Sequence, residues 1–206
     1  MILKKITAAG INWTQSNKTD GHFQSLCATP TGRIIAGSIG SAKGIWYSDD
    51  NGINWTRSNK TDEYFQSLCV TPTGRIIVSG ASNNVTGIWY SDDNGINWAQ
   101  SNKTDGHFQS LCVTPTGRII AGNNDNLGIW YSDDNGINWT QSNKTDGDWR
   151  SLCVTPTGRI ITGNYTGIWY SDPEYTAVCT KYLDQNGAKE IVTQFKAYCD
   201  NLVGGA

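Results

Sequence analysis

The sequence predicts an all-β fold, and three observations support this prediction. A unit of 41 to 43 residues repeats along most of the 206-residue chain, and its copies are marked by Trp13, Trp55, Trp98 and Trp139. Glycine occurs 23 times and tryptophan nine times, which is typical of short strands joined by tight turns. Helix-forming runs of alanine, leucine and glutamate are missing until the last stretch of the chain. The body of the chain should therefore consist of strands and turns.

Three of the repeats carry the octet Ser-x-Asp-x-Gly-x-x-Trp, at residues 48–55, 91–98 and 132–139. Serine and aspartate oxygens can accept hydrogen bonds from nearby backbone amides, glycine supplies a positive φ, and tryptophan packs behind the turn. The octet therefore predicts a hairpin. Its structural residues are Ser48, Asp50, Gly52 and Trp55, then Ser91, Asp93, Gly95 and Trp98, then Ser132, Asp134, Gly136 and Trp139.

These octets resemble the Asp-box, or BNR, repeat of sialidases, sortilin-like receptors and several β-propeller lectins. In that family the box joins the third and fourth strands of a propeller blade and lies away from the ligand face. The resemblance implies a fold, and it does not imply a reaction.

A repeat of this length is typical of one four-stranded propeller blade. In the second copy a buried first strand ends in a Thr-Pro-Thr-Gly turn, where proline presets φ and glycine relaxes it. A second strand, a polar loop, a third strand, the octet and a fourth strand follow. We predict these strands at residues 65–70, 75–78, 87–91 and 97–100.

The two ends of the repeat region complement each other. Residues 10–15 match the second half of an octet and a fourth strand, and residues 169–172 match a third strand whose octet breaks at Pro173. Pairing these segments would leave no open sheet edge. We therefore predict a small β-propeller of about four four-stranded blades, spanning residues 1–173 and closed by the N-terminal strand. Two alternatives remain: a partial blade from residues 2–6 with 177–182, or two chains that share one larger ring.

Residues 174–206 form a separate C-terminal extension in this prediction. Asp184 to Gly187 precede an amphipathic helix that places Ala188, Ile191, Phe195, Tyr198 and Leu202 on one face. This face either docks against the propeller or joins copies of the chain into a homo-oligomer. Residues 181–187 with this helix also resemble short segments in tail-fibre proteins of phages of gut bacteria, which implies an association with a virion.

The net charge of −2 argues against a broad nucleic-acid-binding surface. No apolar run approaches the roughly 18 to 20 residues that span a bilayer, and residues 1–6 lack the hydrophobic region of a signal peptide. We therefore expect a chain that is neither inserted in a membrane nor exported, and the sequence assigns no further localisation.

The six cysteines do not suggest a disulfide framework. Cys27, Cys69, Cys112 and Cys153 occupy the same place in successive repeats, so separate blades should hold them apart as reduced, buried thiols. Cys179 and Cys199 lie outside the repeats and could pair. Because no metal-binding spacing is present, we expect neither a metal nor another cofactor.

Differences between the copies gather at one predicted face. The loops between second and third strands vary, and so do the blade-to-blade connections, and both emerge opposite the octets. This face carries aromatic and polar residues suited to ligands such as sugars. Drift in unconstrained loops explains the variation equally well. The candidate ligand-binding residues are His22, Phe23, Tyr64, Phe65, His107, Phe108, Asp148, Trp149 and Tyr165.

The resemblance to sialidases suggests an enzyme, but the residues argue against this. Sialidase chemistry uses a tyrosine nucleophile with a glutamate, and three clustered arginines that grip the sugar carboxylate. Here four of the six arginines follow the Thr-Pro-Thr-Gly turns, away from the variable loops, and glutamate occurs only at positions 63, 174 and 190. We therefore expect no catalytic activity.

The leading functional hypothesis is a non-enzymatic module that binds glycans or a cell-surface receptor through the variable loops. It would be part of a phage tail or fibre if the tail-fibre resemblance holds. The alternative is a structural propeller that makes protein–protein contacts, and a sialidase-like glycoside hydrolase is the least favoured interpretation.

Overall fold

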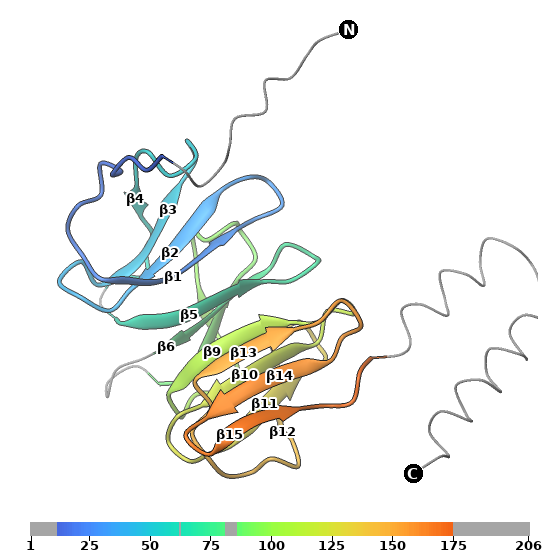
Figure 1. Ribbon diagram of the computed structural model, residues 1–206. Coiled ribbons are helices and arrows are strands. Elements are labelled where there is room, and N and C mark those ends of the chain that lie inside the picture. Colours follow the sequence, from blue (N-terminus) through green and yellow to red (C-terminus); the bar gives the residue numbers. More distant parts are fainter. Residues whose placement is uncertain (1–11, 62, 81–85, 175–206) are drawn as a thin grey trace, which may run out of the picture.

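The computed structural model describes residues 12–61, 63–80 and 86–174, and it contains four antiparallel sheets that follow one another along the chain (Figure 1). Each sheet is one blade. Blade 1 is β1–β4, blade 2 is β5–β8, blade 3 is β9–β12 and blade 4 is β13–β15. The strands are β1 Phe23–Ala28, β2 Ile34–Ser38, β3 Gly44–Ser48, β4 Thr56–Arg57, β5 Phe65–Val70, β6 Ile76–Gly80, β7 Ile88–Ser91, β8 Ala99–Gln100, β9 Phe108–Val113, β10 Ile119–Asn123, β11 Ile129–Ser132, β12 Thr140–Gln141, β13 Ser151–Val154, β14 Ile160–Asn164 and β15 Gly167–Tyr170.

The strands of each blade pair in chain order, as the repeat predicts. In blade 2, Cys69 lies opposite Ile77, and Ile77 lies opposite Tyr90 in the next strand. The predicted first strand has the bounds of β5, and the other predicted strands agree with β6, β7 and β8 within two residues. The prediction of an all-β repeat fold is therefore confirmed, and the described residues contain no helix.

The apolar core lies between blades. Ile35 and Ile45 of blade 1 pack against Phe65, Leu68 and Ile76 of blade 2. An equivalent cluster joins blades 2 and 3. Each blade therefore has two different faces: a leading face that meets the preceding blade, built from residues such as Phe65 and Leu68, and a trailing face that meets the following blade, built from residues such as Ile35 and Ile45.

A hydrogen bond from a backbone amide to a serine side chain repeats from one blade interface to the next. The leucine amide of one innermost strand donates to a serine Oγ of the preceding innermost strand, from Leu68 to Ser25 at 3.0 Å and from Leu111 to Ser67 at 2.9 Å. Leu152 donates to Ser110 in the same way, at 3.0 Å. The same contact therefore fixes the relative position of neighbouring innermost strands at all three blade interfaces.

The predicted closure of the ring by the N-terminal strand is wrong for the part of that segment which the structure describes. Residues 12–15 form no strand, and β15 is the edge of a three-stranded sheet. The innermost strands pack in the order β1, β5, β9 and β13, and no comparable contact joins β13 to β1 among the described residues. In each complete blade the fourth strand forms only two residue pairs with the third strand. Two pairs are too few to close the ring when the faces of blades 1 and 4 are not in contact.

Several predictions concern residues outside the described part of the chain. These are the C-terminal amphipathic helix, the partial blade from residues 2–6 with 177–182, and the pairing of Cys179 with Cys199. Within the described ranges, no helix is long and apolar enough to cross a membrane.

Cys27, Cys69, Cys112 and Cys153 are free thiols, as predicted, but the first three are only partly buried. Burial raises the pKa of the Cys27 and Cys112 thiols to about 12, which keeps both protonated near neutral pH. Cys153 of blade 4 is exposed, because no blade covers it within the described part of the chain.

Candidate functional site

Each Asp-box turn is held by its own side chains. Ser48 Oγ accepts a hydrogen bond from the Gly52 amide at 2.9 Å, and Asp50 Oδ1 accepts from the Asn54 amide at 2.9 Å. Trp55 Nε1 donates to the Gly52 carbonyl at 3.1 Å. The boxes of blades 2 and 3 repeat these bonds. The backbone amide of Asn54 lowers the pKa of Asp50 to about 2, so this acid serves the turn.

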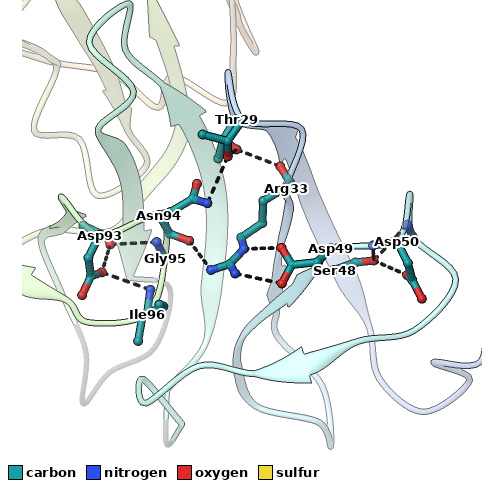
Figure 2. A network of polar contacts seen from close by, with 12 residues as sticks. Thr29, Arg33, Ser48, Asp49, Asp50, Asp93, Asn94, Gly95 and Ile96 are labelled. Carbon is teal, nitrogen blue, oxygen red and sulfur yellow. Dashed lines mark hydrogen bonds and ion pairs between the residues drawn. The ribbon is translucent and has the colours of Figure 1, made fainter.

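Two of the arginines that follow the Thr-Pro-Thr-Gly turns, Arg33 and Arg75, join neighbouring blades on the Asp-box face (Figure 2). Arg33 forms a bidentate pair with Asp49, at 2.6 and 2.8 Å, and donates to the Asn94 carbonyl of the next blade at 3.0 Å. Its guanidinium also lies 4.2 Å from the centre of the Tyr47 ring. Hydrogen bonding to Asp49 raises the pKa of Arg33. Arg75 repeats the arrangement, so these arginines have structural partners.

Three of the predicted ligand-binding aromatics are core residues, which corrects the sequence-based assignment. Phe65 and Trp149 are fully buried, and Phe108 is 1% exposed. The two phenylalanines begin β5 and β9 and pack between blades, while the Trp149 ring makes an edge-to-face contact with Trp169 at 6.0 Å. The sequence placed these aromatics beside variable loops, but the pleat of the sheet directs their rings into the interfaces.

The remaining candidates are spread over all four blades. His22 is exposed, Phe23 stacks on Trp55 at 6.4 Å, and the Lys43 ammonium lies 4.9 Å from the centre of the Tyr64 ring. Tyr165 is 77% exposed. These side chains therefore do not converge on one site.

One cluster of polar contacts at the junction of blades 3 and 4, on the variable face, contains two of the predicted residues, His107 and Asp148. His107 Nδ1 lies 3.0 Å from Asp125 Oδ1, and the His107 amide donates to the same carboxylate at 2.9 Å. The Asn126 amide donates to Asp148 at 3.2 Å, and Asn126 Oδ1 accepts from the Gly147 amide at 2.5 Å. These groups satisfy one another across two loops, so they hold the loops together.

An open pocket lies where the four blades converge on the Asp-box face. We call it the axial pocket, and its volume is about 620 Å³. Each blade contributes the last residue of its innermost strand and the Thr-Pro that follows. The lining residues are Ala28, Thr29, Pro30, Val70, Thr71, Pro72, Val113, Thr114, Pro115, Val154, Thr155 and Pro156.

The lining of the axial pocket is mostly carbon. The Thr71 hydroxyl lies 2.9 Å from the Thr73 hydroxyl and donates to the Arg75 carbonyl at 3.3 Å, and Thr29 makes the equivalent contacts. Because these hydroxyls already have partners, proline rings and the methyl groups of valine, alanine and threonine dominate the surface. Sequence reasoning missed this site, although the fourfold Thr-Pro-Thr-Gly turn was the signal that could have indicated it.

The sheets, their order and the box turns define a β-propeller type of repeat protein. Comparison with known families supports this, because residues 46–57, 89–100 and 130–141 match the BNR/Asp-box repeat. The chain carries three Asp-box repeats, and the resemblance inferred from its octets is confirmed. A comparison with curated protein sequences found no match.

Several solved structures have a similar fold. A protein described as a putative gluconolactonase superposes with a TM-score of 0.62 at 15% identity, over 75% of this chain and 61% of that one. An ancestral GH74 enzyme gives 0.55 at 14% identity, over 69% and 22%. YCF48 bound to D1 peptide gives 0.53 at 20% identity, over 76% and 51%. The chain spans about three fifths of the gluconolactonase, and at these identities the likeness shows the fold alone.

These findings overturn the functional hypothesis drawn from the sequence. It assigned a non-enzymatic glycan-binding or cell-surface-binding module, with a structural propeller and a sialidase-like hydrolase as alternatives. The similar structures include a gluconolactonase and a GH74 enzyme, so the fold does not select a non-enzymatic glycan-binding role. The buried positions of Phe65, Phe108 and Trp149 also remove half of the six proposed aromatic rings from the surface. The tail-fibre resemblance of the C-terminal segment stays a prediction.

Proposed function

We propose that the chain binds a small, uncharged, mainly apolar ligand in the axial pocket. The observation that carries this proposal is the fourfold lining of the pocket on the Asp-box face, opposite the variable loops. Its volume of about 620 Å³ lies within the range of roughly 300 to 1,000 Å³ that small-molecule sites occupy.

The chemistry of the lining favours this ligand class. The four Thr-Pro segments offer ring and methyl carbons, and the hydroxyls of Thr29 and Thr71 are engaged with neighbouring threonines and carbonyls. A charged ligand would lose its hydration without gaining a partner, which is costly. An uncharged apolar ligand instead gains roughly 25 cal/mol per Å² of apolar surface that it buries.

The same lining argues for binding without chemical conversion. No acid, base or thiol is among the twelve residues of the axial pocket. General acid–base catalysis needs such a group within hydrogen-bond reach of the reacting atom, and the threonine hydroxyls of the lining would need an adjacent base to act as nucleophiles. We therefore propose a binding role at this site and no enzymatic activity there.

Methyl NMR tests the proposal directly. A library of uncharged, mainly apolar fragments would be titrated into protein labelled at alanine, valine and threonine methyl groups. We expect binding fragments to shift the methyl signals of Ala28, Val70, Val113 and Val154 together, since all four line one cavity. Shifts that gather elsewhere, or no shift with any fragment, would contradict the proposal.

A pair of matched variants gives the control. Pro72 and Pro115 are exposed at the second position of their turns, where most residues fit, so Pro72→Glu with Pro115→Glu should fold and abolish binding. Ile96→Glu with Ile137→Glu adds the same charge to exposed positions of the Asp boxes on the same face. We expect this second variant to bind normally.

A further inference from the structure

In the described part of the chain, no blade covers the leading face of blade 1. It forms a cavity of about 390 Å³ lined by Ser16, Lys18, Phe23, Leu26, Ile34, Ala36, Gly52 and Trp55. Most of these residues have counterparts in blade 2 that are covered by blade 1. Leu26 is 57% exposed, for example, whereas its counterpart Leu68 is 6% exposed. The face has the composition of a blade interface but lacks its partner.

The trailing face of blade 4 likewise has no other described blade against it. Ile168 is 81% exposed, whereas its counterparts Ile45 and Ile88 are fully buried. A Cβ atom added at Gly163 would meet no described atom within 4 Å, but one added at its counterpart Gly37 would lie 3.0 Å from Leu68 Cδ1. Both free faces are therefore halves of the interface that the other blades form.

The two free faces match each other residue by residue. At complete interfaces an isoleucine touches the Asp-box glycine of the next blade, with Ile35 Cδ1 2.8 Å from a Cβ built on Gly95 and Ile77 Cδ1 2.6 Å from one built on Gly136. By repetition, the isoleucine that corresponds to Ile35 and Ile77 is Ile161 of blade 4, and its glycine partner is Gly52 of blade 1. A Cβ built on Gly52 has only atoms of its own blade within 4 Å. By the same repetition Leu26 would face Gly163 and donate its amide to Ser151 Oγ.

The N-terminal segment extends this match to the sheet edge. The Asn17 amide donates to the Ile53 carbonyl at 3.0 Å, just as Asn102 donates to Ile137 at 3.0 Å. Asn102 follows β8, the fourth strand of the preceding blade, so residues 13–15 lie where a preceding blade would hold its fourth strand. Trp13 in this segment is 87% exposed. The sheet of blade 4 ends at β15 and lacks this strand.

We propose that a second copy of this chain fills both gaps, with blade 4 of each copy packed head to tail against blade 1 of the other. Within one copy the two faces do not meet, because β13 packs against β9 and no comparable contact reaches β1 in the described ranges. Figure 1 shows blade 1 and blade 4 toward opposite ends of the view. Two copies give eight blades, within the usual range of four to eight.

The proposal fixes a strand register across each seam. In complete blades the strand pair is Trp46 with Arg57 and Tyr47 with Thr56. Repetition places Gln15 of one copy opposite Trp169 of the other, and Thr14 opposite Tyr170. Each seam then contains a completed four-stranded blade and a covered pair of apolar faces. This inference does not depend on the ligand proposed for the axial pocket.

Native mass spectrometry of a mixture of isotope-labelled and unlabelled protein tests whether two copies assemble. The full chain would be prepared with ¹⁴N and with ¹⁵N, unfolded together, refolded and measured. We expect dimers of all three isotope compositions in a 1:2:1 ratio. A monomer at micromolar concentration would overturn the proposal and would indicate that blade 4 or a terminal segment of the same chain covers the faces.

Seam variants identify which faces are used. Leu26→Glu and Ile168→Glu each spoil one face at an exposed position, so each alone should reduce the dimer at least tenfold while leaving the circular dichroism spectrum unchanged. Gly163→Tyr should do the same by filling the seam. Ile137→Glu places the same charge on an exposed site of blade 3 and should remain dimeric. Dimers that survive all three seam changes would refute the head-to-tail arrangement.

Mixing the two variants distinguishes a contact between unlike faces from a contact between two copies of the same face. Leu26→Glu keeps an intact trailing face, and Ile168→Glu keeps an intact leading face. A mixture should therefore form heterodimers through one seam, although each variant alone forms few dimers. A failure to form heterodimers would contradict a contact between unlike faces.

Discussion

The aspartate of the Asp box is the residue whose chemistry is most fully defined. Asp50 accepts two backbone hydrogen bonds and one from the Asn54 side chain, and the first cause of its lowered pKa is the Asn54 amide. Its carboxylate therefore stays ionised to lower pH in the folded chain than in the unfolded chain. Asp93 and Asp134 accept the same set of bonds.

This geometry predicts the acid limit of stability. The pKa of Asp50 falls from an ordinary 3.8 to about 2, so its contribution is complete above about pH 4 and is lost as pH falls toward 2. We expect the midpoint of thermal unfolding to fall over that window. The triple variant Asp50→Asn, Asp93→Asn, Asp134→Asn should start lower at pH 7 and fall less. Equal slopes for the two proteins would show that other groups control the acid transition.

The Asp-box glycines provide a test at the same scale. Gly95 and Gly52 have nearly equal φ values, +86° and +87°, but only Gly95 faces a close isoleucine from the preceding blade. Gly95→Ala should therefore cost the positive-φ strain plus a clash of roughly 1 to 3 kcal/mol, whereas Gly52→Ala in an isolated copy should cost the strain alone. Urea unfolding at low protein concentration measures the difference. Equal losses would refute the close packing at Gly95.

At the scale of elements, the innermost strands set the step between blades. Ser67 Oγ accepts the buried Leu111 amide, so Ser67→Ala should leave that donor unpaired and cost roughly 1 to 3 kcal/mol. The matched control is Ser151→Ala, since Ser151 is exposed and no described blade follows to donate to its hydroxyl within one copy. Unfolding by urea at low concentration should show a loss only for Ser67→Ala. A similar loss for both variants would mean that the serine hydroxyl acts within its own strand.

For the whole molecule, an array of blades is stabilised chiefly by contacts between neighbours. Blades 2 and 3 each have two such contacts, whereas blades 1 and 4 have one. We expect hydrogen exchange at low concentration to be slowest in β6 and β10 and fastest in β15, whose residues are all exposed. Raising the concentration should slow exchange in β1 and β15 selectively if two copies associate. Uniform protection at every concentration would contradict the open array.

Much of the fold could be predicted from the sequence because its determinants are local. The Thr-Pro-Thr-Gly turns and the strand patterns of blade 2 lie within a few residues of each other, and the structure has them where the repeat indicates. The candidate site was predicted less well. Phe65 and Trp149 stand beside variable loops in the sequence, but whether a ring points to solvent or into an interface depends on how the next blade packs.

The sequence by itself determined the repeat, its strands and the Asp-box hairpins, because serine, aspartate and glycine direct the backbone within a single turn. The tertiary structure decided which aromatics are core, that four separate turns form one axial pocket, and that blades 1 and 4 each keep one face that no other described blade covers. These outcomes depend on the angle between blades. That angle is set by contacts between residues about 43 positions apart, such as Ser25 with Leu68, which a local pattern does not encode.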